Sequence, residues 1–86
     1  MRKPLNWPER PEYACELHHV FGGPNRKWSE KYNCVIYLPR QAHTGKNGVH
    51  SDACFARRLH ERYQRKLEDA GWTRGEFVET FGRNYL

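Results

Sequence analysis

Residues 13–21 of this chain read YACELHHVF, and the turn residues Gly22, Gly23, Pro24 and Asn25 follow them directly. An apolar and aromatic run that stops at a Gly-Pro cluster is typical of a β-strand that ends in a turn. Residues 34–38 (CVIYL) form a second such run, which Pro39 ends. The two runs predict the strands of a hairpin, and we expect residues 26–33 to be a polar loop with a short turn near Ser29.

Two helices are predicted after the hairpin. Residues 39–50 are expected to be mostly loop, and Ser51 or Asp52 is a plausible N-cap for the first helix. From there to Gly71, apolar residues recur every three or four positions, which predicts an amphipathic helix. Thr73 and Glu76 have the spacing of a capping box, which predicts a second, short helix over residues 74–81 that Gly82 ends.

The order of these elements places the chain in the α+β class. With 86 residues it forms one small domain, which we assign to residues 13–86. Residues 1–12 carry Pro4, Pro8 and Pro11, and proline at this density predicts an extended N-terminal arm rather than a helix or strand. Small domains with little apolar material often depend on disulfides, a bound metal or a partner subunit.

Composition narrows the location and the partners. The three cysteines, Cys15, Cys34 and Cys54, cannot all pair, and no secretory segment precedes them, so we expect a reducing, cytoplasmic location and a metal rather than disulfides. No apolar run is long enough to predict a membrane span. The balance of 15 Lys and Arg against 10 Asp and Glu gives a net charge of +5, which suits a polyanion such as nucleic acid.

The histidines are concentrated in one part of the chain, because four of the five lie between residues 18 and 50. His18 and His19 are adjacent on a predicted strand, so their rings should point to opposite faces. His43 and His50 flank a glycine-containing turn that can fold His50 back toward His43. Imidazole is the commonest metal ligand, and three histidines that leave one position open are typical of a catalytic metal site. We expect His60, in the long helix, to be exposed.

These residues resemble the ββα-metal finger of HNH nucleases. The likeness rests on the run LHHVFGG at residues 17–23, followed by Asn33, Leu38, His43 and His50. The chain is more closely similar to small phage proteins of the recombination-enhancement, RecA-dependent nuclease type. That similarity extends from about Cys15 to the C-terminal residues FGRNYL.

The resemblance implies a role for each matching residue. His19 would be the general base that activates water, and Asn33 would orient that base or help to bind the metal. His18, His43 and His50 would hold one divalent ion: zinc, manganese, nickel or magnesium. The reaction implied is hydrolysis of DNA phosphodiester bonds, in the host cytoplasm if a phage encodes the chain. A recombinase or another phage or host DNA-processing protein is the partner implied besides DNA.

Basic residues in two places are candidates for contact with nucleic acid. Arg26 and Lys27 follow the glycine turn after the first strand, and Arg58 and Arg62 lie on the polar face of the long helix. Acidic residues are interspersed on that face, so a solvated helix surface is the other interpretation of Arg58 and Arg62.

Two other functions fit the same residues. Cys15, His18, His43 and His50 supply four ligands, enough for a closed structural zinc site in a module that binds nucleic acid without cleaving it. Alternatively, the chain is a phage accessory protein that acts through its basic helix alone.

Overall fold

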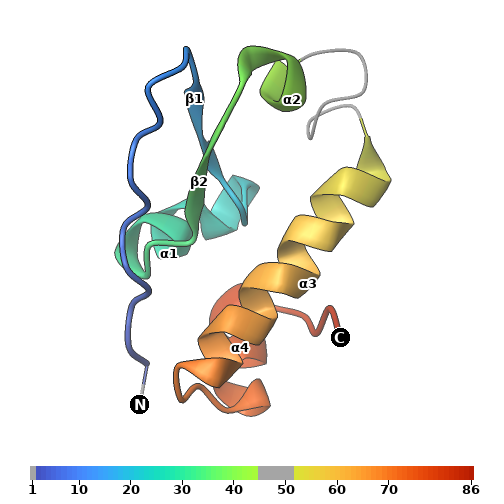
Figure 1. Ribbon diagram of the computed structural model, residues 1–86. Coiled ribbons are helices and arrows are strands. Elements are labelled where there is room, and N and C mark those ends of the chain that lie inside the picture. The colour runs from blue at the N-terminus through green and yellow to red at the C-terminus, as the bar shows by residue number, and fades with distance from the viewer. Residues whose placement is uncertain (1, 45–51) are drawn as a thin grey trace.

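The computed structural model describes residues 2–44 and 52–86 of the chain (Figure 1). Its elements, in chain order, are β1 (Glu16–His19), the 3-10 turn η1 (Gly23–Asn25), α1 (Arg26–Lys31), β2 (Val35–Leu38), α2 (Arg40–Thr44), α3 (Ala53–Asp69) and α4 (Arg74–Phe81). Two antiparallel strands together with helices confirm the α+β class. None of the described helices is long and apolar enough to cross a membrane.

The predicted antiparallel pair is confirmed, although both strands are shorter than predicted. Glu16 lies opposite Leu38 and His19 opposite Val35 in the ladder. The Val20 N–H continues the pairing by donating to the Cys34 carbonyl over 2.9 Å.

The connection between the strands holds a helix, so the prediction of a loop over residues 26–33 was wrong for residues 26–31. Buried Ser29 explains why so short a helix forms here. Its hydroxyl donates to the Phe21 carbonyl over 2.8 Å and accepts from the Phe21 N–H over 3.0 Å. Asn25, just before α1, donates to the Phe81 carbonyl over 2.8 Å. These long-range bonds fix α1 against the end of β1 and the end of α4.

A second helix, α2, replaces the first part of the loop predicted for residues 39–50. Pro39 starts it, since the Pro39 carbonyl accepts hydrogen bonds from the N–H groups of Ala42 and His43. The rest of that predicted loop, including His50, lies outside the described residues.

The two predicted helices near the C-terminus are confirmed with their caps. Asp52 Oδ1 accepts from the N–H groups of Cys54 and Phe55, which starts α3, and the helix is followed by Gly71 at φ 112°. Thr73 and Glu76 form the capping box of α4, and Gly82 ends that helix in a left-handed conformation at φ 88°.

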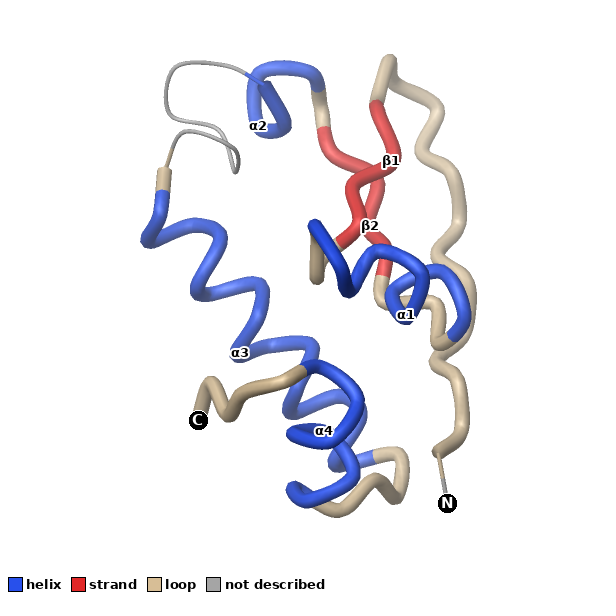
Figure 2. Tube along the Cα trace, turned by 180° about the vertical axis from the view of Figure 1, so that it is seen from behind, coloured by secondary structure: helices blue, strands red, loops and turns tan. Residues whose placement is uncertain are grey.

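The core gathers around Phe21, directly after β1, where the ring is 1% exposed. Its centroid lies 4.3 Å from that of Phe81 and 5.5 Å from that of Phe77, both in α4. Leu59 and Leu67 on one face of α3 are buried in the same cluster. The core therefore lies where α3, α4 and the end of β1 meet (Figures 1 and 2).

The first residues of the chain form neither helix nor strand, and hydrogen bonds hold them to the body. The Leu5 N–H donates to the Tyr32 carbonyl over 2.9 Å, and the Asn33 amide donates to the Leu5 carbonyl over 2.7 Å. Trp72 Nε1 donates to the Lys3 carbonyl over 2.8 Å. This N-terminal segment (residues 2–11) runs alongside the hairpin in both views (Figures 1 and 2).

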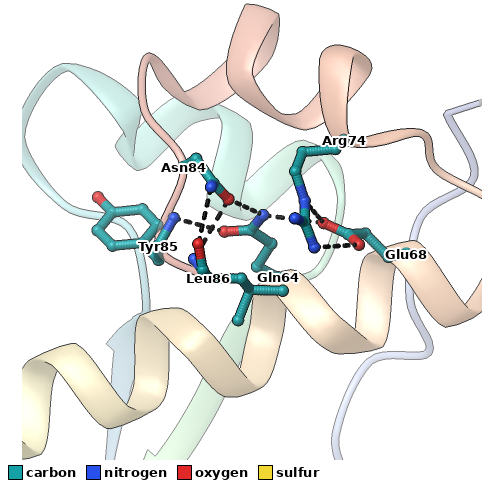
Figure 3. A network of polar contacts seen from close by, with 6 residues as sticks. All are labelled: Gln64, Glu68, Arg74, Asn84, Tyr85 and Leu86. Atoms are coloured by element: carbon teal, nitrogen blue, oxygen red, sulfur yellow. Dashed lines mark hydrogen bonds and ion pairs between the residues drawn. The ribbon is translucent and has the colours of Figure 1, made fainter.

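At the other end of the chain, the C-terminal residues are fixed to α3 by fully buried Gln64 (Figure 3). Gln64 Nε2 donates to Asn84 Oδ1 over 2.7 Å, and Gln64 Oε1 accepts from the Tyr85 N–H over 2.8 Å. Gln64 also donates to Glu68, whose second partner is Arg74. Hydrogen bonds from Arg74 and Gln64 hold the pKa of Glu68 below its ordinary value.

Candidate functional site

The adjacent histidines of β1 contact different helices, as the alternation of side chains along a strand predicts. The His18 ring meets the His43 ring of α2 edge to face, with 5.2 Å between centroids. His19 Nε2 lies 3.0 Å from Glu30 Oε1 of α1. The two short helices that the sequence did not predict therefore supply the partners of both site histidines.

Both residues nevertheless line one cavity of about 310 Å³. His43 also lines it, so three of the four histidines proposed for the site come together in space. Arg26, at the first position of α1, lines the same cavity beside Gly22 and Gly23. Three histidines and one arginine thus line the same cavity.

Glu30 is a member of this site that sequence reasoning missed. A carboxylate can only accept, so the His19 Nε2–H donates to it. A carboxylate on one ring nitrogen fixes the orientation and tautomer of an imidazole, which makes the other nitrogen the proton acceptor. The signal was hidden because six helical residues are too few for a periodic pattern, and the segment therefore resembled a polar loop.

Glu16 plays the corresponding part for His43. Its Oε1 accepts from His43 Nδ1–H over 3.2 Å, so a metal-ligand role for His43 would use Nε2. Histidines that bind metals usually donate their other N–H in this way. His18 is 7% exposed, which places its ring between the strand and α2 rather than in solvent.

The residues present fit part of a metal site. The His18 and His43 rings are in contact, and imidazole ligands suit zinc, manganese or nickel better than magnesium. Among residues 2–44 and 52–86, no three His, Cys, Asp or Glu side chains are grouped for a metal. The third predicted ligand, His50, lies outside that part of the chain.

Asn33, predicted to assist His19, has different surroundings. Its backbone is left-handed at φ 60°, a conformation that asparagine tolerates better than most residues. Its amide donates to the Leu5 carbonyl, and its side chain borders a separate cavity next to the N-terminal segment. The structure does not bring Asn33 to the cavity of the three histidines.

The other basic residues predicted to contact nucleic acid are also dispersed. The Lys27 ammonium lies 4.9 Å from the centroid of the Trp28 ring, and Lys27 does not line the histidine cavity. Arg58 and Arg62 line a third cavity, along α3. Cys15, a ligand in the alternative zinc site, is a half-buried free thiol outside the lining of the histidine cavity.

His60 is half-buried, so the expectation of an exposed side chain was wrong. Its Nε2–H donates to the Val20 carbonyl over 2.8 Å, and its ring stacks on Phe21 with 5.2 Å between centroids. Burial lowers the pKa of His60. This histidine joins α3 to the end of β1 and has a structural role.

Compared with known protein families, with curated proteins and with solved structures, the chain has no match.

Proposed function

We propose that this chain is a metal-dependent endonuclease of the ββα-metal type that hydrolyses phosphodiester bonds in DNA. The observation that supports this is the single cavity lined by His18, His19, His43 and Arg26, with His19 paired to Glu30. In this proposal the hairpin and α3 correspond to the ββα unit, and two contacts join them. Tyr63 donates to the Val35 carbonyl over 3.3 Å and His60 to that of Val20 over 2.8 Å.

His19 is the general base of the proposed reaction. Glu30 accepts the Nε2–H, so Nδ1 receives the proton of the attacking water, and Glu30 acts as a positioning residue. Arg26 binds a non-bridging oxygen of the phosphate through its guanidinium. His18 and His43, together with His50, would hold a divalent ion, and such an ion would supply positive charge to polarise the phosphate and stabilise the leaving oxygen.

The proposal also covers the partners of the protein and its location in the cell. DNA is the substrate, and the net charge of +5 supports a polyanion. The resemblance to RecA-dependent phage nucleases adds the host cytoplasm and a recombinase or related DNA-processing protein. In this proposal the proline-rich N-terminal segment is an extended arm attached to the ββα-metal domain.

Nicking of supercoiled plasmid across a series of divalent metals tests the proposal. We expect cleavage by the wild type, loss of cleavage on chelation of the metal, and a fall of about 10²–10⁴-fold in rate for His19→Ala. Glu30→Gln should lower the rate at least about tenfold while plasmid binding is unchanged, because it acts through His19. Glu61→Gln is the matched control, since Glu61 pairs with Arg57 on the solvent-facing side of α3 and does not line the histidine cavity.

Normal cleavage by a folded His19→Ala variant would contradict the role of His19. If the wild type cleaves no DNA or RNA with any metal, the non-catalytic zinc module is the better description. In that case Cys15→Ser should weaken metal binding, whereas under the nuclease proposal it should not.

A further inference from the structure

A cavity of about 410 Å³ separates the N-terminal segment from α3. Leu5, Trp7 and Pro8 line one side, and Tyr63 and Lys66 of α3 line another. We call this the arm cleft. Figure 1 shows the backbone of these elements, with the blue N-terminal segment on one side of β2 and α3 on the other.

Trp7 presents an unusual surface at this cleft. It is 48% exposed, whereas Trp72 in the core is 3% exposed. The indole contacts the hairpin, since Nε1 donates to the Tyr37 hydroxyl over 3.4 Å. The Arg10 guanidinium lies 5.9 Å from the centroid of the same Tyr37 ring. A large aromatic ring is therefore positioned by the fold and left accessible, with a cation nearby.

The chemistry of the arm cleft fits an unpaired nucleobase. Its two charged lining residues, Lys66 and Asp69, have opposite signs, so the lining suits a neutral heteroaromatic ring better than a phosphate. The Asn6 amide, also in the lining, can donate to and accept from a base edge. Bases stack on exposed aromatic side chains in proteins that bind single strands, while cations around the ring follow the backbone.

We propose that the arm cleft binds an unpaired base of single-stranded DNA, stacked on Trp7, with Arg10 and Lys66 near the flanking phosphates. Bases in a duplex are stacked on each other and cannot enter, so the cleft selects single-stranded over double-stranded DNA.

The arm cleft lies close in the fold to the histidine cavity, so base binding there could position DNA for cleavage. Val35 lines the cleft, and its cross-strand partner His19 lines the histidine cavity. Paired residues in antiparallel strands have Cα atoms about 4.5–5.5 Å apart. The two cavities therefore border paired positions of one hairpin, and in this proposal the DNA strand continues from the cleft toward His19. Single-stranded or branched DNA would then be the preferred substrate of the nuclease, and this consequence rests on the proposed function. Binding of an unpaired base in the arm cleft does not depend on it.

Titration of the whole protein with a short oligothymidylate, without divalent metal, tests the binding. We expect quenching of tryptophan emission, and affinity about tenfold lower for Trp7→Ala but within about threefold of the wild type for Trp7→Phe, which keeps a ring for stacking. Tyr13→Ala is the matched control, since Tyr13 is an aromatic of the same region, 54% exposed, that does not line the cleft. Its affinity should equal that of the wild type.

The inference is wrong if the wild type does not bind the oligonucleotide, or if folded Trp7→Ala binds it as tightly as the wild type. Equal, Trp7-dependent binding of the corresponding duplex would also overturn it. Circular dichroism of each variant checks that it is folded. If the wild type does not nick plasmid with any metal but binds the oligonucleotide in a Trp7-dependent way, the nuclease proposal is refuted and this inference stands.

Discussion

Neighbouring histidines in this protein have different chemistry because each has a different partner. His18 packs its ring against the His43 ring, while His19 donates to the Glu30 carboxylate. Side chains at consecutive positions of a strand point to opposite faces. A candidate metal ligand and a candidate general base can therefore be neighbours in the sequence and still contact different helices. The same residue type in α3, half-buried His60, donates to a backbone carbonyl and stacks on Phe21.

His60 leads to a prediction about the pH dependence of stability. Burial, as the largest cause, lowers its pKa in the folded state below the ordinary value of 6.5. The unfolded chain therefore binds the proton more tightly, and His60 stabilises the fold fully above pH 6.5. That contribution is lost as the pH falls from 6.5 through the lower folded pKa.

Urea denaturation of the wild type and His60→Gln at a series of pH values measures this effect. Glutamine can still donate to the Val20 carbonyl but does not titrate. We expect the stability difference between the two proteins to shift in favour of the variant as the pH falls below 6.5. A difference that is constant across this range would contradict the assigned cause.

Helices form here for two different reasons. α3 and α4 carry their own signals, a buried apolar stripe and side-chain caps at Asp52 and Thr73. α1 and α2 have six and five residues, too few to be stable alone, and contacts with other elements hold α1. The candidate site depends on these two short helices, since Glu30 lies in α1 and His43 in α2.

The capping box of α4 is expected to stabilise the whole domain. Thr73→Ala removes the acceptor of the Glu76 N–H and should lower the free energy of unfolding by about 1 kcal/mol. Thr73→Ser keeps a hydroxyl and should retain most of that stability. Thermal or urea denaturation followed by circular dichroism measures both variants. If Thr73→Ala and Thr73→Ser are equally stable, the hydroxyl does not contribute as a cap.

At the scale of the whole molecule, both ends of the chain are tied to the body. The N-terminal segment is fixed at Leu5 and Lys3, and the C-terminal residues at Gln64. In a chain with so few apolar residues, these polar attachments extend the folded body beyond its aromatic core. The N-terminal segment also forms one side of the arm cleft, through Leu5, Trp7 and Pro8.

A double-mutant cycle tests the attachment of the C-terminal residues. Gln64→Leu removes the acceptor of the Tyr85 N–H and one partner of Asn84, and deletion of residues 84–86 leaves Glu68 as the remaining partner of buried Gln64. Each change should cost about 1–3 kcal/mol. Together they should cost less than their sum by at least about 0.5 kcal/mol, because both remove the same bonds. Fully additive losses in urea denaturation would mean that the network in Figure 3 is not a coupled unit.

Local signals in the sequence were sufficient for β1, β2, α3 and α4, because side-chain periodicity, caps and turn residues act within a few positions of the chain. They were also sufficient for the opposite orientation of His18 and His19, which follows from the repeat of a strand. The roles assigned to Asn33 and His50 stay predictions.

The partners of the site histidines, in contrast, were set by packing. Glu30 reaches His19 because buried Ser29 holds α1 against Phe21, and Asn33 turns to Leu5 because the N-terminal segment lies beside it. His60 is covered because α3 crosses the end of β1. Each of these contacts joins residues distant in sequence, and its free energy depends on where the other elements lie, so no local pattern in the sequence could predict it.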